Sequence, residues 1–221
     1  MKVSVVIPQY KHYDLLHQVI FDLYKYCRQD VDEIVIVDDA SNDPDLDDYI
    51  KIGMGMRFFP TRVFTNNENI GFLKTVNRGV EKASGDIVVI LSNDVRIYKN
   101  ICKEIKEFLQ ANEKLILGAR LIDFNSGWNE FRGRIYQYLE GWLIACTKKA
   151  WNELGGFDER YGLSDFEDVD FSTTAIKFGY SLVELSDGAR HDHPASSYGF
   201  NPEREIRTKK NRKLFEEKWT K

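Results

Sequence analysis

The sequence predicts an α/β fold, with a mostly parallel central sheet and helices on both of its faces. Short runs of β-branched and aliphatic residues alternate with longer segments whose apolar residues recur at helical spacing. This alternation is typical of parallel strands connected by helices. The 221 residues are enough to bury a sizeable core. Because no repeat or low-complexity linker interrupts the chain, we expect a single domain over residues 1–221.

The N-terminal part opens with a strand and a helix. A β-branched run ends at Pro8, and Leu15, Leu16, Val19, Ile20 and Leu23 then follow at helical spacing. Two further buried runs end in acidic or polar residues, as strands that deliver side chains to an edge of a sheet do. The predicted strands are residues 3–7, 34–37, 57–65 and 87–91, and the predicted helices are residues 14–27 and 72–83.

The C-terminal part continues the alternation with one irregular stretch. Helices are predicted at residues 101–109, 148–154 and 168–178, and strands at residues 115–118 and 142–147. Glycines at 155, 156 and 179 follow two of these helices, where they favour helix ends. Residues 120–140 lack clean periodicity, so we expect a loop or irregular hairpin that covers a site.

Charge and hydropathy limit the partners. The formal net charge of −4 gives no general basic field, so nucleic acid is not expected. No apolar stretch reaches the roughly 20 residues that span a bilayer, and the N-terminus enters a strand directly, so we expect a cytoplasmic protein. Residues 202–219 form a predicted charged helix. Its basic residues allow contact of residues 203–219 with an anionic membrane, an exposed helix or a dimer contact.

Acidic and imidazole groups gather in separated segments. Ser92-Asn93-Asp94 ends the strand at residues 87–91, where open α/β sheets bind ligands. The cluster Glu167-Asp168-Val169-Asp170 and the histidines His191 and His193 follow later in the chain. Oxygen and imidazole ligands of this kind suit metal-assisted transfer from a phosphorylated donor.

The order and spacing of several motifs resemble an inverting glycosyltransferase of the GT-A (Rossmann-like) fold, close to family 2, which uses nucleotide-sugar donors. The resemblance covers nearly the whole chain. The motifs are residues 3–10, 36–43, 69–72 with Asn77 and Gly79, 85–94, 155–159, 167–170 and 179–180. It implies that residues 1–97 bind the nucleotide sugar, that residues 98–200 bind the acceptor, and that residues 201–221 form the charged helix.

The resemblance assigns the nucleoside to the ends of the first two strands. Pro8 and Tyr10 would contact the nucleoside, and Asp39 would accept a hydrogen bond from uracil or a similar base. The physical argument agrees, because carboxylates at a strand end cannot be buried unpaired and should face the crevice. Alternatively, Asp38 and Asp39 cap a turn together with Ser41 and its neighbours.

Further donor contacts are expected beside Gly71 and in the Ser-Asn-Asp motif. Asn69 and Lys74 flank Gly71 at a helix start, where free N–H groups and a cation meet nucleotide or phosphate. A surface lysine is the alternative for Lys74. Asn93 is assigned to the nucleotide sugar.

The resemblance also implies a divalent cation, Mn²⁺ or Mg²⁺. Residues 92–94 stand where the family has Asp-X-Asp, with Ser92 replacing the first acid, so Asp94 would hold the metal and binding should be weaker than with two carboxylates. His191 or His193 would supply the second ligand, and an imidazole favours Mn²⁺. The spacing to Ser196 selects His191, although a plain loop histidine is the alternative for both.

Asp168 is the expected catalytic base, since it takes the position of the family's catalytic Asp. Its place at a helix start should favour the ionised form. Glu167 is expected either to orient an acceptor hydroxyl or to act as a helix-terminal charge. Trp142 is expected to stack on a sugar ring or to lie in the core.

These residues together predict an inverting glycosyltransferase that moves a sugar from UDP or dTDP to a hydroxyl of a glycan or lipid-linked acceptor, as polysaccharide biosynthesis requires. One alternative is a non-catalytic nucleotide-sugar or glycan-binding module, which the reduced Ser-Asn-Asp motif suggests. The other is a sugar nucleotidyltransferase. That class has a glycine-rich, arginine-bearing loop after the first strand, which residues 8–12 lack.

Overall fold

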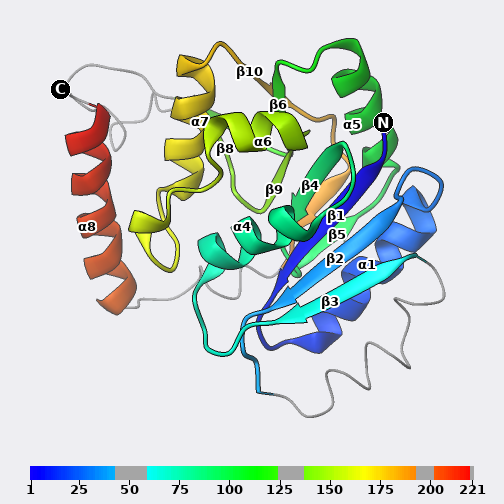
Figure 1. The fold of residues 1–221 in the computed structure, drawn as a ribbon, viewed down its shortest axis with the longest axis horizontal. Helices are drawn as coiled ribbons and strands as arrows, with labels where there is room; N and C mark the ends of the chain where they lie inside the picture. The colour runs from blue at the N-terminus through cyan, green and yellow to red at the C-terminus, as the bar shows by residue number, and fades with distance from the viewer. Residues whose placement is uncertain (43–58, 124–136, 193–201, 220–221) are drawn as a thin grey trace.

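The chain folds around a seven-stranded sheet with the order β10-β6-β9-β4-β1-β2-β3 (Figure 1). The structure is a computed structural model that describes residues 1–42, 59–123, 137–192 and 202–219. The strands of this sheet are β1 (Val3–Gln9), β2 (Glu33–Asp38), β3 (Thr61–Thr65), β4 (Ile87–Leu91), β6 (Leu115–Gly118), β9 (Leu143–Thr147) and β10 (Ser181–Glu184).

The sheet is mixed but mostly parallel, as predicted. Neighbouring strands run parallel throughout β4, β1, β2 and β3, and β10 is parallel to β6. Only β9 runs against its neighbours, β4 and β6. Because β4, β1 and β2 are parallel neighbours, their carboxyl ends lie at one edge of the sheet, where the predicted donor residues follow them.

Helices cover both faces of the sheet (Figure 1). They are α1 (Tyr13–Cys27), α4 (Phe72–Lys82), α5 (Ile101–Ala111), α6 (Lys148–Leu154), α7 (Glu167–Lys177), α8 (Pro202–Trp219) and the 3₁₀ turn η1 (Glu159–Tyr161). Helices α1 and α5 pack on one face, and α4, α6 and α7 pack on the other. The burial of aliphatic side chains on both faces explains why the strands are continuously apolar in sequence.

Close packing between α4 and the sheet depends on Gly79. A β-carbon at this position would lie 2.4 Å from Cγ1 of Val6 and 3.3 Å from Cγ2 of Val37. A contact of 2.4 Å is far inside van der Waals distance, so a larger residue would push the helix away from β1. Gly79 therefore sets the distance of α4 from the sheet.

Several short strands were not predicted from the sequence. A two-stranded sheet joins β5 (Val95–Ile97) to β11 (Ala189–His191), and β10 completes one edge of the main sheet. Strands β7 (Leu121–Asp123) and β8 (Gln137–Leu139) pair antiparallel at the two ends of the stretch predicted as a loop or irregular hairpin. Residues 57–58 of the third predicted strand lie outside the described residues, as does the middle of residues 120–140, so a covering role for that stretch stays a prediction.

Helix α8 is held to the rest of the molecule by its charges and by one aromatic side chain. Phe215 is buried in the core beside α4, α6 and α7. Arg204 and Arg207 both contact Asp165, and Lys218 contacts Asp158 and Asp170. This pairing neutralises much of the basic charge on α8 and so does not favour the predicted membrane contact of residues 203–219, which stays a prediction.

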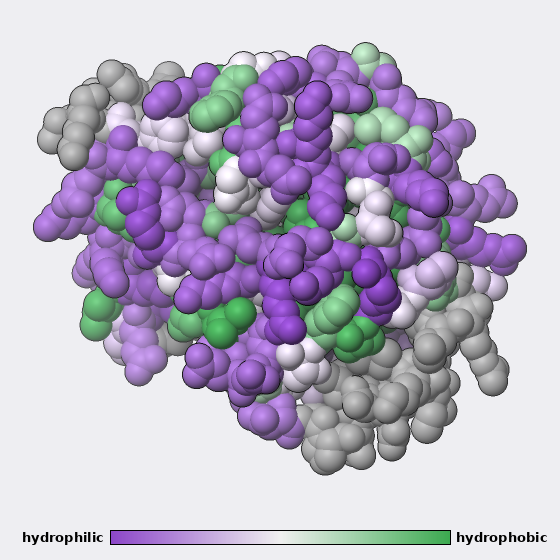
Figure 2. Space-filling view, in the orientation of Figure 1, coloured by the Kyte–Doolittle hydropathy of each residue, from purple (hydrophilic) through white to green (hydrophobic). Residues whose placement is uncertain are grey.

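The described residues carry no broad apolar surface on the face that Figure 2 shows. Hydrophilic residues cover most of that face, and hydrophobic residues appear in small, separate patches. Among the helices that the structure describes, none combines the length and the apolar character that crossing a bilayer requires.

Candidate functional site

The carboxyl ends of β1, β2 and β4 bring the first predicted site residues together. The backbone N–H of Asp39 donates to the carbonyl of Gln9 (2.7 Å), which joins the ends of β1 and β2. The side-chain amide of Asn93 donates to Oε1 of Gln9 (2.8 Å), which joins the end of β1 to the Ser-Asn-Asp motif. Gln9 is 1% exposed. It therefore links two donor segments, a role that was not predicted from the sequence.

The side chain of Asp39 anchors the loop before α4. Its Oδ1 accepts hydrogen bonds from the side-chain amide of Asn66 (2.8 Å) and the backbone N–H of Ile70 (2.9 Å). Its Oδ2 accepts one from the backbone N–H of Gly71 (2.8 Å). A carboxylate oxygen accepts two hydrogen bonds. Asp39 is only 4% exposed, so its carboxylate is buried and paired by the protein instead of facing the crevice as expected. Within the described residues, one acceptor position of Oδ2 stays unfilled.

Asp38 forms the turn contact that the sequence allowed. Its carboxylate accepts hydrogen bonds from the backbone N–H (3.1 Å) and the hydroxyl of Ser41. The Ser41 hydroxyl also accepts a hydrogen bond from the backbone N–H of Lys11 (2.8 Å). Asp38 thus fixes the two loops that follow β1 and β2, while Asp39 binds the loop before α4.

The predicted nucleoside contacts differ in exposure. Pro8 is buried inside β1, whereas Tyr10, directly after the strand, is 42% exposed. The Lys11 ammonium lies 5.0 Å from the centre of the Tyr10 ring. Tyr10 thus presents an aromatic surface at this edge of the sheet, whereas Pro8 is buried within it.

Asn69 and Lys74 flank a helix start that requires glycine. Gly71 has a φ of +86°, and a β-carbon there would lie 2.8 Å from Cα of Leu163. Asn69 is exposed, and its side-chain oxygen accepts a hydrogen bond from the Gly71 N–H (3.2 Å). Lys74 is exposed on the first turn of α4 and makes no ion pair with a described residue. Its ammonium is available to an anionic ligand.

The structure brings Asp94 and His191 into contact, although 97 positions separate them in the chain. The antiparallel pairing of β5 with β11 places His191 opposite Val95. Nε2 of His191 lies 3.0 Å from Oδ1 of Asp94. The side chains are 24% and 10% exposed, so both are partly shielded from water. The alternative ligand His193 lies outside the described residues.

Trp142 lies against this pair. Its indole stacks on the His191 imidazole, with ring centroids 5.5 Å apart and an angle of 13° between the planes. Its Nε1–H donates to Oε2 of Glu140 (2.9 Å), and its carbonyl accepts the N–H of Ser92 (3.0 Å). The sequence offered a sugar or the core as the partner of Trp142. One ring face stacks on an imidazole, and the partly buried side chain also packs against the hydrophobic core, which agrees in part with the core alternative. Contact with a sugar stays a prediction.

Asp168 lies at the start of α7 and is bound to the segment that carries Trp142. Its Oδ2 accepts a hydrogen bond from the N–H of Gly141 (3.1 Å), and its Oδ1 accepts one from the N–H of Val169 (2.8 Å). Burial nevertheless raises the pKa of Asp168 to about 6, because the backbone donors offset only part of the desolvation. The helix start therefore does not have the net effect on ionisation that the sequence suggested.

Glu167, next to Asp168, is buried with one oxygen unpaired. Its Oε2 has no hydrogen-bond partner within the described part of the chain. Burial, followed by the nearby charge of Asp168, raises the pKa of Glu167 well above its ordinary value. A protonated Glu167 can donate a hydrogen bond as well as accept one, whereas a helix-terminal charge would be ionised and exposed.

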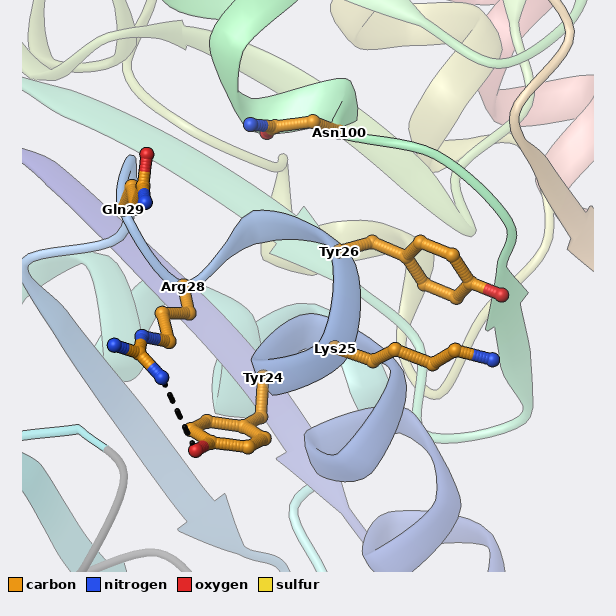
Figure 3. A pocket seen from close by; sticks show the side chains of 6 residues that line it. All are labelled: Tyr24, Lys25, Tyr26, Arg28, Gln29 and Asn100. Carbon is orange, nitrogen blue, oxygen red and sulfur yellow. Dashed lines mark hydrogen bonds between the residues drawn. The ribbon is translucent and has the colours of Figure 1, made fainter.

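Two hollows in the described surface lie away from these residues. One, of about 460 Å³, is formed by the C-terminal turn of α1 and by Asn100 at the start of α5 (Figure 3). There, Nη1 of Arg28 donates to the Tyr24 hydroxyl (3.2 Å). The other, of about 540 Å³, lies between the turn after α6, helix α7 and the end of α8. Neither contains a predicted site residue.

Comparison with protein-family models identifies the family. Residues 4–174 match the model of glycosyl transferase family 2, which is more than half of the chain. The chain belongs to glycosyl transferase family 2. This confirms the resemblance that the sequence motifs indicated.

Individual relatives of this family 2 chain are distant and longer. It is 28% identical over 123 residues to a dolichol-phosphate mannosyltransferase of Pyrococcus furiosus. The aligned residues cover 55% of this chain and 34% of the relative. The chain therefore spans about a third of the length of that curated relative.

Solved structures confirm the GT-A type of α/β fold. The mannosyltransferase PcManGT of Pyrobaculum calidifontis, solved with GDP-Man and Mn²⁺, has 18% identity and a TM-score of 0.66 over 84% of this chain and 55% of its own. GalNAc-T7 with UDP, GalNAc and Mn²⁺ has 19% identity and a TM-score of 0.71 over 86% and 44%. S. aureus TarS 1–349 with UDP-GlcNAc has 20% identity and a TM-score of 0.64 over 92% and 63%.

The side chains of this family 2 chain fit a divalent cation in part. Asp94 and His191 offer an oxygen and a nitrogen that face each other, which suits Mn²⁺ better than Mg²⁺. The described residues contain no group of three or more acidic, histidine or cysteine side chains placed to hold a metal. A cation here would therefore take its remaining ligands from water and from the phosphates of a donor, as divalent cations in phosphate-binding sites do.

Proposed function

We propose that this family 2 chain carries an inverting glycosyltransferase activity, which moves a sugar from a nucleoside diphosphate to a hydroxyl of a glycan or lipid-linked acceptor. The observation that supports it best is the bridge through residues 141–142. Gly141 donates to Asp168, while Trp142 contacts both His191 and the Ser92 N–H. One short segment thereby connects a base of suitable pKa to the pair proposed as metal ligands.

In the proposed reaction, Asp168 accepts the proton of the acceptor hydroxyl. Its pKa of about 6 keeps most of the carboxylate ionised at neutral pH and still basic enough to receive a proton. The hydroxyl oxygen forms a bond to the anomeric carbon on the face opposite the nucleoside diphosphate, and the bond from that carbon to the diphosphate oxygen breaks. This single displacement inverts the anomeric configuration.

The donor would lie over residues 1–97 and the acceptor over residues 98–200. Asp94 and His191 would hold Mn²⁺ or Mg²⁺, which neutralises the charge that builds on the departing diphosphate. Lys74 would contact a phosphate. Glu167, buried beside the base, would orient the acceptor hydroxyl, and Trp142 would border the acceptor side.

UDP or dTDP is the proposed donor nucleotide. The unfilled acceptor position on Oδ2 of Asp39 suits the ring N–H of uracil or thymine. The exposed ring of Tyr10 would lie beside the nucleoside, Pro8 would shape its floor, and Asn69 and Asn93 would contribute amide groups.

The test is release of nucleoside diphosphate from a panel of nucleotide sugars, with Mn²⁺, Mg²⁺ or a chelator. Wild type should release diphosphate slowly from one donor in a metal-dependent way, because water can replace the acceptor. Asp94→Ala should lose the metal-dependent release of diphosphate. Asp168→Asn should lose turnover but still bind the donor. Donor binding without release, with any acceptor supplied, would instead support a non-catalytic binding module, and failure to bind any nucleotide sugar would refute the proposal.

A further inference from the structure

The orientation of the His191 imidazole depends on what contacts its ring. His191 is the last residue of the three-residue strand β11. The Trp142 indole lies parallel to the imidazole, at 13°, and covers one of its faces. A flat stack of this kind restricts the tilt of the imidazole. Nε2 therefore stays directed at Asp94, 3.0 Å away.

The indole itself is fixed by Glu140 and by the backbone. Oε2 of Glu140 accepts the indole N–H at 2.9 Å, and Oε1 lies 3.7 Å from the guanidinium of Arg120. The N–H of Ser92 donates to the Trp142 carbonyl at 3.0 Å, which joins Trp142 to the motif that contains Asp94. Trp142 is thus joined to the Asp94 segment through its carbonyl and to His191 through its indole.

We propose that Trp142, oriented by Glu140, is a positioning residue that holds His191 in the orientation needed to share a divalent cation with Asp94. The inference rests on the proposed function, because it assumes that this pair binds a metal. Neither Trp142 nor Glu140 supplies a ligand. Both act through the imidazole, in the way that the outer partners of metal-bound histidines tune affinity.

The proposal is tested by the affinity for Mn²⁺ alone, measured from the electron paramagnetic resonance signal of the free ion. Trp142→Leu should raise the Kd about tenfold or more, as the loss of an outer partner does. Trp142→Phe should raise it only a few-fold, because a flat ring can still stack on the imidazole. Glu140→Gln keeps an acceptor for the indole N–H and should stay close to wild type, whereas Glu140→Leu should weaken binding.

The matched control is Trp151→Leu. Trp151 is 4% exposed and packs on Phe157 and Phe171, on the opposite face of the sheet from α1. Its replacement should destabilise the fold without changing the Mn²⁺ affinity. A Trp151→Leu protein that loses Mn²⁺ as strongly as Trp142→Leu would assign the effect to general destabilisation and overturn the proposal.

A measurement without metal tests the contact between Trp142 and His191 by itself. Stacking on an indole should shift the ring protons of His191 upfield in the NMR spectrum, and Trp142→Leu should abolish that shift. If His191→Ala weakens Mn²⁺ binding and folded Trp142→Leu does not, the positioning role is wrong while the metal site stands. If wild type binds no Mn²⁺ with or without donor, the metal site fails, and the inference fails with it.

Discussion

Replacement of Asp168 by Asn should separate catalysis from stability. If Asp168 is the general base, Asp168→Asn should lower the turnover rate by about 10²–10⁴-fold. Burial raises the pKa of this carboxyl from 3.8 to about 6 in the folded protein. That rise lowers the unfolding free energy of wild type by about 3 kcal/mol at pH values above 6. A neutral amide avoids this cost, so the inactive variant should be the more stable protein.

The direction of this pH dependence of stability follows from which state, folded or unfolded, holds the Asp168 proton more tightly. In the unfolded chain the carboxyl ionises near 3.8, and in the folded protein near 6. Wild type therefore loses stability as the pH rises from about 4 to about 6, and the loss stays constant above that range. The amide of the Asp168→Asn variant does not titrate. The amide keeps one acceptor oxygen and replaces the other with an NH₂ group, so one of the two hydrogen bonds from Gly141 and Val169 is lost, at a cost of about 1 kcal/mol. The expected net gain at pH 8 is therefore about 2 kcal/mol.

Urea unfolding of both proteins at pH 4.5, 6 and 8 tests this. The stability gain of Asp168→Asn should grow from pH 4.5 to pH 6 and then level off towards pH 8. A difference that is the same at every pH would refute the argument that burial raises the pKa of Asp168, and full turnover in Asp168→Asn would refute its role as the base. Asp170→Asn is the control, because Asp170 accepts hydrogen bonds from Trp219 (2.7 Å) and Lys218 (2.8 Å). That variant should be destabilised, with an unshifted pH–rate profile.

Three further predictions concern the framework of the site. Asp22, 2% exposed on α1, accepts hydrogen bonds from Nε of Arg96 (2.7 Å) and the N–H of Ile97 (3.1 Å). Because these bonds hold β5, which directly follows Asp94, Asp22→Asn should weaken Mn²⁺ binding. An unchanged Mn²⁺ titration would contradict this. Although burial opposes it, hydrogen bonds from Ser4, Ser84 and Arg62 lower the pKa of Glu33 from 4.5 to about 2. Its carboxylate should thus contribute about 3 kcal/mol above pH 4.5, lost as the pH falls towards 2; in acid unfolding, Glu33→Gln should lack this dependence. Gly79→Ala should lower the unfolding free energy by about 1–3 kcal/mol, since its β-carbon would meet Val6; a urea midpoint equal to that of wild type would show that α4 can shift freely.

Much of the fold could be predicted from local patterns. The long apolar runs of β1, β2 and β4 and the periodic helices α1, α4 and α5 were predicted within a few residues of their observed bounds. These elements bury one face or both, so their hydrophobic period is strong. Strands β5, β10 and β11 have three or four residues each. Such short segments carry little periodic signal, and they form because neighbouring strands offer hydrogen-bond partners.

The candidate site was predicted in its residue types more completely than in its contacts. Asp94 and Asp168 were assigned from the family motifs, His191 from its spacing to Ser196, and Trp142 as an aromatic residue after Gly141. Their arrangement through the segment at residues 140–142 was not, and Gln9 and Glu140 were missed. A polar residue at the end of a buried strand, for Gln9, or directly before the Gly-Trp pair, for Glu140, was the only available signal. Each acts through a partner distant in sequence, which local spacing does not reveal.

The sequence by itself determined the α/β class, the family and the strand ends at which polar groups gather, because hydrophobic period and motif order are local properties of the chain. The tertiary structure decided which of those groups meet. It placed His191 on Asp94, stacked Trp142 on His191 and joined Gly141 to Asp168. It also reversed the expected effect on the Asp168 carboxyl, since the cost of burying a charge depends on everything packed around it and outweighed the favourable helix start.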